Sequence, residues 1–104
     1  SYRPVVEQFE AALHPNTLQR LQSGQDCLFI DAQNNLSAVL AWQVYSKVTI
    51  NTQDAQTCQY HLLKHKADDA QVAGGWQILW QGHRPREDYE HFILVHKQQF
   101  DALF

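Results

Sequence analysis

Several residue types are scarce in this 104-residue sequence, and each scarcity excludes a class of protein. Lys and Arg total 8 against 11 Asp and Glu, so the net charge of -3 argues against the strongly basic face of a nucleic-acid-binding protein. The longest apolar runs fall far short of the roughly 20 residues that a membrane helix needs. No charged segment followed by an apolar one opens the chain, so we expect no signal peptide and a soluble, cytoplasmic protein.

Cysteine is also scarce: Cys27 and Cys58 are the only two, and they form no C-x-x-C pair. We predict that both are buried and reduced on strands, where a thiol behaves as a small apolar group. The alternative is one disulfide, which would imply an oxidising compartment. The sequence does not decide between these two states.

Apolar residues are plentiful by contrast. They make up 44% of the chain, enough for one core, whereas charged residues make up 18%, too few for a disordered chain. The length predicts a single domain over residues 1–104. Because a domain of this size buries only about 60–65% of its unfolded surface, a homodimer that hides more apolar area is expected.

Two short helices are predicted near the N-terminus. Apolar residues at helical spacing predict a helix over Pro4–Leu13, and Pro15 disfavours its continuation. Asn16 followed three residues later by Gln19 resembles a capping box and predicts the start of a second helix. Gly24 is a natural end for that helix.

The rest of the chain is predicted to be mostly strand. The continuous apolar run Cys27–Ile30 is typical of a buried strand. Alternation favours a strand from Leu36 to Ile50, although Leu36–Lys47 also fits a helix. Thr57–Lys66 is interpreted as a strand as well, with a helix as its alternative. Further elements are expected at Trp76–Gln81 (strand), Tyr89–His96 (strand) and Gln98–Phe104 (short helix).

These elements predict an α+β fold in which two short N-terminal helices pack on a curved antiparallel sheet of four to five strands. A shared face of Trp76, Ile78 and Trp80 would meet the helices and form the core. The layout is similar to that of the cystatin-like and nuclear-transport-factor-like α+β rolls. This resemblance implies architecture alone and transfers no functional residue.

Six histidines raise the question of a metal site. On a helix, Cys58, His61 and His65 would lie within reach of one ion, whereas on a strand His61 and His65 are about 13 Å apart. His91 and His96 fall on opposite faces of their predicted strand. We therefore predict no metal and no cofactor.

Two groups of side chains are candidate ligand sites. The first is an apolar pocket on the aromatic face of the sheet, with a carboxylate and a histidine as its polar groups. Its predicted residues are Asp31, Trp42, Tyr60, Trp76, Trp80 and His91. The second is the loop around Pro85, where His83, Arg84 and Arg86 can bind an anion unless the acidic residues that follow neutralise them.

No catalytic signature such as G-x-S-x-G or H-E-x-x-H is present, so we assign no catalytic residue and do not expect an enzyme. The small size and the 12% aromatic content favour a binding or accessory module that acts through protein contacts, as a homodimer or with another protein. The alternative is a hydrolase- or isomerase-like roll, or a binder, with an aromatic pocket for a small apolar ligand. Neither nucleic acid nor a membrane is an expected partner.

Overall fold

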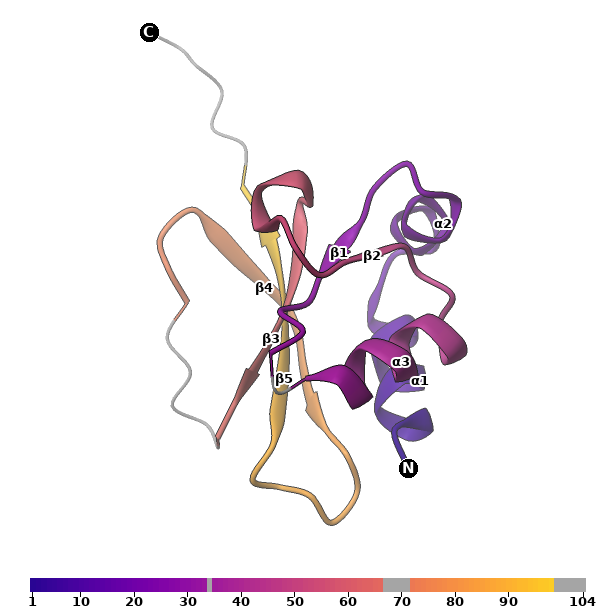
Figure 1. Cartoon of the computed structure of the whole chain (residues 1–104), viewed down its shortest axis with the longest axis vertical. Coiled ribbons are helices and arrows are strands. Elements are labelled where there is room, and N and C mark those ends of the chain that lie inside the picture. The colour runs from indigo at the N-terminus through magenta and orange to yellow at the C-terminus, as the bar shows by residue number, and fades with distance from the viewer. Residues whose placement is uncertain (34, 67–71, 99–104) are drawn as a thin grey trace, which may run out of the picture.

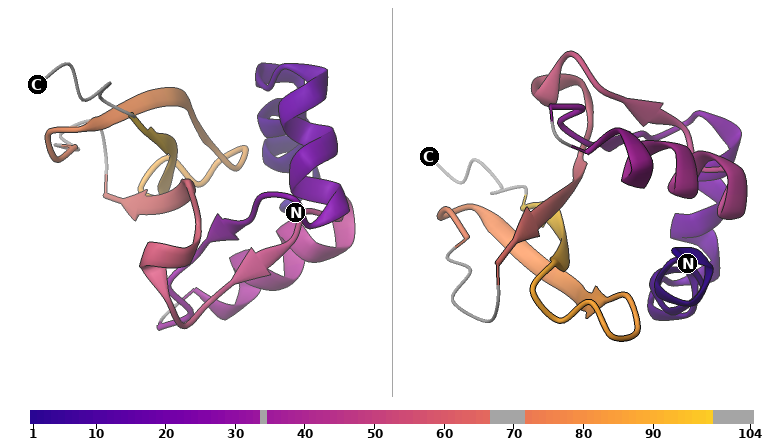
Figure 2. Two further views of the ribbon diagram at one scale, coloured as in Figure 1. Left: turned by 90° about the horizontal axis from the view of Figure 1, so that it is seen from above. Right: turned by 60° about the horizontal axis from the view of Figure 1, so that its bottom comes forward.

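The computed structural model of the chain describes residues 1–33, 35–66 and 72–98, and within them three α-helices lie on one side of a five-stranded sheet (Figures 1 and 2). The expected α+β class is therefore confirmed. The elements in chain order are α1 (Arg3–Ala12), α2 (Pro15–Ser23), β1 (Leu28–Phe29), α3 (Leu36–Tyr45), β2 (Ile50–Asn51), the 3-10 turn η1 (Ala55–Thr57), β3 (Tyr60–His65), β4 (Trp76–His83) and β5 (His91–Lys97). None of the described helices has both the length and the apolar content needed to cross a membrane.

The sheet is mixed, so the prediction of a purely antiparallel sheet is wrong. Its strand order is β2-β1-β3-β5-β4. Strand β1 pairs in parallel with both β2 and β3, whereas β3 and β4 run antiparallel to β5. The physical reason is α3, which connects β1 to β2. Adjacent parallel strands need such a crossover, which a tight turn cannot provide.

Helix α3 corrects the preferred interpretation of the segment that follows the Gln33 turn. Leu36–Tyr45 is helical, so the strand prediction is wrong for these residues and the helical alternative is right. The inner face of α3 is buried, with Trp42 at 0% exposure and its ring edge-on to that of Phe9 at 5.7 Å. Tertiary packing of this face fixes the helix against the β propensity of its residues.

The two N-terminal helices lie close to their predicted positions. Helix α2 begins at Pro15, and His14 provides its N-cap by accepting a hydrogen bond from the Asn16 N–H at Nδ1, 3.1 Å away. The predicted capping box through Gln19 is therefore wrong, because the capping group lies two residues earlier. The helix ends at Gly24, as predicted, in the left-handed conformation that glycine adopts without strain (φ 86°).

The second half of the sheet follows the predicted strands with one correction. Strand β3 confirms the strand interpretation of the Thr57–Lys66 segment. In β4, however, a bulge between Ile78 and Trp80 shifts the register. Trp76 and Ile78 therefore face away from the helices, opposite Lys97 and Val95, whereas Trp80 packs against the core. The prediction that Trp76, Ile78 and Trp80 share one face is therefore wrong. The extra residue of the bulge interrupts the alternation of side chains along the strand.

The main core lies between the helices and the sheet. Its largest fully buried side chains are Trp42, Phe9, Phe92, Leu21, Leu28, Ile30 and Leu94. On the opposite face of the sheet, Ile93 and Val95 are also buried, at 1% and 2% exposure, outside this cluster. The sheet thus has apolar side chains on both faces, as a central strand with continuous apolar sequence requires.

Cys27 and Cys58 form a disulfide with Cα atoms 5.0 Å apart, so the prediction of two reduced thiols is wrong. The cause lies in the parallel pairing of β1 with β3, which places Leu28 opposite Tyr60. The cysteines just before the two strands are thereby brought together. Residues 99–104 of the predicted terminal helix and much of the loop before β4 lie outside the described residues.

Candidate functional site

The aromatic residues predicted to line an apolar pocket do not meet in one place. Trp42 on α3 and Tyr60 on β3 are buried in the main core. Trp80 packs against the same core from β4. Trp76 lies on the other face of the sheet, where its ring is 4.4 Å from that of His61. These side chains fill two sides of the sheet and enclose no common cavity.

The two polar members of that predicted pocket are engaged in local turns. The Asp31 carboxylate accepts a hydrogen bond from the Gln33 N–H at 3.0 Å and closes the turn before α3. Nε2 of His91 lies 2.6 Å from the carbonyl oxygen of Asp88, in the turn before β5. Across the described residues, no hydrogen bond joins Asp31 to a histidine.

The cations of the predicted anion-binding loop have different environments, because, among the described residues, Arg84 belongs to an ion-pair network and Arg86 does not. Glu90 lies 3.2 Å from Nε of Arg84 and 3.6 Å from Nζ of Lys64, so these two cations share its carboxylate. Arg86 is exposed. Nδ1 of His83 lies 2.8 Å from the carbonyl oxygen of Arg84. The structure therefore does not present Arg84 together with Arg86 to a ligand.

A row of histidines crosses the face of the sheet that lies away from the helices. His91 on β5 is directly opposite both His65 on β3 and His83 on β4. The rings of His83 and His91 are 5.1 Å apart. Sequence spacing does not reveal this row, because it depends on the register of three strands. Over residues 1–33, 35–66 and 72–98, no group of three or more His, Cys, Asp or Glu side chains could hold a metal ion.

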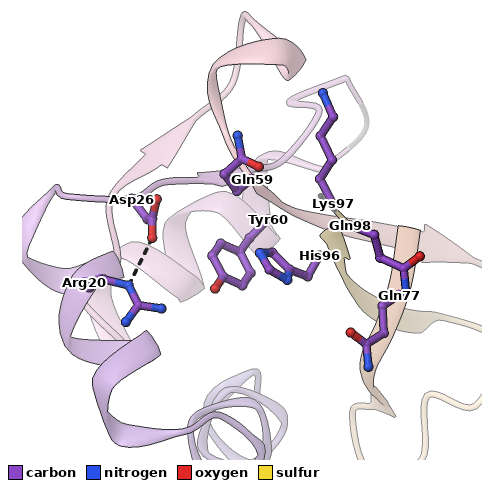
Figure 3. A pocket seen from close by; sticks show the side chains of 8 residues that line it. All are labelled: Arg20, Asp26, Gln59, Tyr60, Gln77, His96, Lys97 and Gln98. Atoms are coloured by element: carbon purple, nitrogen blue, oxygen red, sulfur yellow. Dashed lines mark hydrogen bonds and ion pairs between the residues drawn. The ribbon is translucent and has the colours of Figure 1, made fainter. Parts of the chain in front are cut away.

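A polar cleft of about 630 Å³ lies where α2 faces the sheet, and we call it the Arg20 cleft (Figure 3). Helix α2 and the loop after it supply Arg20 and Asp26 on one side. The other lining residues come from the sheet strands and their ends. Tyr60 and His96 lie in the middle, and Gln77 and Gln98 lie on the far side from Arg20. The full lining set is Arg20, Asp26, Gln59, Tyr60, Gln77, His96, Lys97 and Gln98. Of these residues, sequence reasoning had singled out only Tyr60 as a site residue.

Arg20 is held in place by its neighbours. Its Nε donates to Asp26 Oδ2 at 3.3 Å, and its Nη2 donates to Thr17 Oγ1 at 3.4 Å. The neighbouring Tyr60 hydroxyl and the hydrogen-bonded Asp26 raise the pKa of Arg20 above its ordinary value. A guanidinium fixed in this way presents a permanent positive charge in one orientation.

The floor of the Arg20 cleft is formed by two stacked aromatic rings. The imidazole of His96 is stacked on the Tyr60 ring, with centroids 4.4 Å apart and an angle of 15° between the planes. The disulfide joins the sequence neighbours of two lining residues, because Cys27 follows Asp26 and Cys58 precedes Gln59 in the chain. The loop after α2 and the segment that leads into β3 are therefore linked covalently.

A second surface feature lies on the outward face of α3. Leu36, Leu40 and Val44 are 64%, 52% and 64% exposed, and their spacing of four residues places them in one line. We call these three residues the α3 stripe. A groove of about 380 Å³ runs beside it, lined by Tyr2 and Tyr45 among others. Large apolar side chains exposed in such a row need a partner to be shielded from water.

Comparison with known proteins gives no relative from which a function could be transferred: no family model, no curated protein and no solved structure matches this chain.

Proposed function

We propose that this domain is a non-enzymatic interaction module that assembles with a second copy of itself through the α3 stripe. The observation that carries the proposal is the exposure of Leu36, Leu40 and Val44 on one helix face. Contiguous exposed apolar side chains on a folded domain mark a contact surface. Helices pack against helices through such rows of side chains at spacings of four residues.

The stripe is suited to a copy of itself because it is symmetric about its centre. Leu36 and Val44 lie four residues before and after Leu40. In an antiparallel pair of α3 helices, Leu40 would meet Leu40 at the two-fold axis, and Leu36 of each copy would meet Val44 of the other. An isologous interface requires this kind of self-complementarity.

Charge also favours the antiparallel pair. Helix α3 carries no charged residue, so two copies do not repel each other at the contact. Asp31 precedes the helix and Lys47 follows it, and both are exposed. An antiparallel arrangement brings the negative flank of one copy towards the positive flank of the other and opposes the two helix dipoles.

The proposal is tested by sedimentation velocity over a range of protein concentrations. Because a ten-residue helix spans only about 15 Å, the contact is small, and we expect a dissociation constant no tighter than about 1 μM. Leu40→Glu and Leu40→Lys should each weaken dimerisation at least about tenfold, because each places like charges together at the axis. Gln19→Glu, an exposed substitution on α2, is the matched control and should leave dimerisation unchanged.

Mixing the two charged variants tests the symmetry itself. Leu40→Glu and Leu40→Lys proteins should form a mixed dimer, since opposite charges then meet at the axis. A wild-type chain that stays monomeric at millimolar concentration would refute self-association. Dimerisation that the Leu40 variants leave unchanged would place the interface elsewhere, and a mixture that stays monomeric would exclude Leu40 from the axis.

We also propose that the domain works in an oxidising compartment and not in the cytoplasm. The Cys27–Cys58 disulfide supports this, because disulfides persist in oxidising environments and are rare where thiols are kept reduced. Mass spectrometry of alkylated protein, taken from cells without a reducing step, is the direct measurement. Quantitative alkylation of both cysteines would contradict the proposal.

A further inference from the structure

We propose that the Arg20 cleft binds a free α-amino acid whose side chain is polar and uncharged, the chemistry of glutamine (Figure 3). The cleft is lined by α2, the loop after it and the ends of β3, β4 and β5. It shares no residue with the α3 stripe, so binding there is independent of the proposed self-association.

The register of the sheet decides which lining side chains face α2. His96 on β5 is paired with Tyr60 on β3 and with Gln77 on β4, and residues paired in this way share a face. The three side chains therefore form one row on the helix side of the sheet. Lys97 follows His96 and lies on the opposite face, and it points away from Arg20 in Figure 3. Its charge is therefore not directed into the cleft.

The ion pair between Arg20 and Asp26 sets the kind of charge that the cleft can recognise. Nε of Arg20 lies 3.3 Å from Oδ2 of Asp26, so one cation and one anion stand side by side without an excess of either sign. A zwitterion matches such a pair, because its carboxylate can bind the guanidinium while its ammonium binds the aspartate.

Both members of the pair keep bonding capacity for a ligand. Arg20 uses two of the five N–H donors of a guanidinium for Asp26 and Thr17, and the neighbouring Tyr60 hydroxyl can take a third. Oδ1 of Asp26 accepts no hydrogen bond from any described residue. The side chains of Arg20 and Asp26 are 37% and 27% exposed, so a ligand can reach them while their mutual contact holds them in place.

The contact between the two side chains also fixes the spacing of the ligand's charges. Because Arg20 and Asp26 touch, the carboxylate and the ammonium that bind them must be neighbours as well. A free α-amino acid carries both groups on one carbon atom, whereas a peptide carries them at opposite ends. The pair therefore favours a free amino acid over either terminus of a peptide.

The far side of the cleft is suited to an uncharged polar side chain. In Figure 3, Gln77 and Gln98 lie across the cleft from Arg20, beyond the stacked rings of Tyr60 and His96. Each glutamine offers an amide with two donors and one acceptor, which pairs with another amide or a hydroxyl. Paired residues in a row are about 5 Å apart, so Gln77 lies about 10 Å from Tyr60. An extended glutamine molecule with its hydrogen bonds spans that distance.

The lining disfavours amino acids with apolar side chains. No aliphatic side chain is among its eight residues, whereas sites for apolar groups are lined mainly by aliphatic and aromatic residues. The volume of about 630 Å³ falls within the range of small-molecule sites. The cleft is therefore suited to a compact and strongly polar molecule.

The test is titration with four probes, followed by NMR chemical shifts of the backbone amides of Arg20, Tyr60 and His96. L-Glutamine is the zwitterion, N-acetyl-L-glutamine lacks its ammonium, L-glutaminamide lacks its carboxylate, and L-leucine has an apolar side chain. L-Glutamine should bind at least about tenfold more tightly than either singly charged derivative, because each derivative leaves one member of the ion pair without its partner. L-Leucine should bind several-fold more weakly, since it offers nothing to Gln77 and Gln98.

Substitutions in the ion pair separate binding from structural damage. Asp26→Asn should weaken L-glutamine binding at least about tenfold and leave N-acetyl-L-glutamine no weaker, because that probe has no ammonium for Asp26 to bind. Arg20→Gln should weaken L-glutamine in the same way and leave L-glutaminamide unchanged. A damaged fold would weaken every probe alike. Arg86→Gln, the same change of charge at an exposed position outside the cleft, is the matched control and should alter none of them.

The comparison of the four probes on the wild-type protein needs no substitution, so it remains decisive if a variant fails to fold. Equal affinity for L-glutamine and one of its singly charged derivatives would overturn the proposal and indicate a site for a peptide terminus. Unchanged L-glutamine binding by Asp26→Asn would overturn it as well. So would the absence of any shift with L-glutamine at about 100 mM, well above the millimolar dissociation constant expected of a ligand this small.

Discussion

The position of the Trp80 side chain requires a glycine at position 82. The Trp80 ring meets Phe9 of α1 at 5.8 Å in an edge-to-face contact, so it forms part of the contact between the helices and β4. The same ring lies over Gly82. A Cβ added to Gly82 would lie 2.3 Å from Trp80 Cζ2, a separation that real atoms do not reach. Alanine at position 82 must therefore displace the tryptophan ring.

We expect Gly82→Ala to lower the free energy of unfolding by about 1–3 kcal/mol, the usual cost of overpacking a filled site. Gly74→Ala is the matched control, because an added Cβ there meets nothing within 4 Å. It should change stability by less than about 0.5 kcal/mol. Urea denaturation of both variants provides the measurement, and equal stabilities would show that Trp80 moves aside without cost.

Individual residues also show why most of the candidate site could not be predicted. Arg20, Tyr60 and His96 come from three segments that are far apart in the chain, and only the packing of α2 against the sheet and the register of β3 with β5 bring them together. No spacing between these three residues in the sequence predicts that they lie close together. The opposite error occurred with Trp42, whose aromatic character suggested a ligand site although the side chain is fully buried in the core.

Among the elements, α3 was mispredicted because its sequence has no clear period. Its apolar residues surround the helix, both on the buried face and on the exposed stripe, so alternation and helical spacing fit the same letters. Helix α1 was predicted almost to the residue, because its buried positions Val5, Val6 and Phe9 lie on one face. The type of an amphipathic element can therefore be predicted from its sequence, whereas that of an element with apolar residues on all sides cannot.

Helix α2 allows a stability prediction at its first turn. His14 caps the helix through Nδ1, but an imidazole carries no negative charge to favour the positive end of the helix dipole. His14→Asp keeps a hydrogen-bond acceptor for the Asn16 N–H and adds that charge. We expect it to raise the free energy of unfolding by about 0.5–1 kcal/mol at neutral pH.

His14→Ala is the control for this prediction, because it removes the acceptor and should lower stability by up to about 1 kcal/mol. Chemical denaturation at low and high salt separates the two contributions. The gain from aspartate should shrink at high salt, where the dipole is screened, while the loss from alanine should persist. A destabilised His14→Asp variant would show that the His14 ring stabilises α2 through some other contact.

For the whole molecule, the order of the strands is what the sequence left undetermined. Strand β1 lies within the strand predicted over Cys27–Ile30. However, β1 and β2 are only two residues long, too short to indicate how they pair, and the parallel pairing of β1 with β3 joins segments more than 30 residues apart. The antiparallel pairs of β5 with β3 and β4 involve longer strands, which were predicted. Short parallel pairs of this kind need support from elsewhere in the fold.

The Cys27–Cys58 disulfide supplies that support, and it is the basis of a prediction for the whole fold. The bond closes a loop with a sequence separation of 31 that contains β1, α3 and β2. In the chain-entropy account, a cross-link of this span restricts the unfolded chain and stabilises the fold by about 3.5–4 kcal/mol. Reduction should therefore lower the free energy of unfolding by about that amount, as measured by urea denaturation with and without dithiothreitol.

A Cys27→Ser, Cys58→Ser double variant separates the effect of the bond from that of the reductant. Without dithiothreitol it should already be less stable than the wild-type protein by about 2–5 kcal/mol, and adding dithiothreitol should not change it further. Because Cys58 lies two residues before Tyr60, which pairs with His96, the amide signals of Tyr60 and His96 should also broaden or shift in the double variant. A wild-type protein whose unfolding curve is insensitive to dithiothreitol, although both thiols have become free, would show that the parallel strands hold together without the bond.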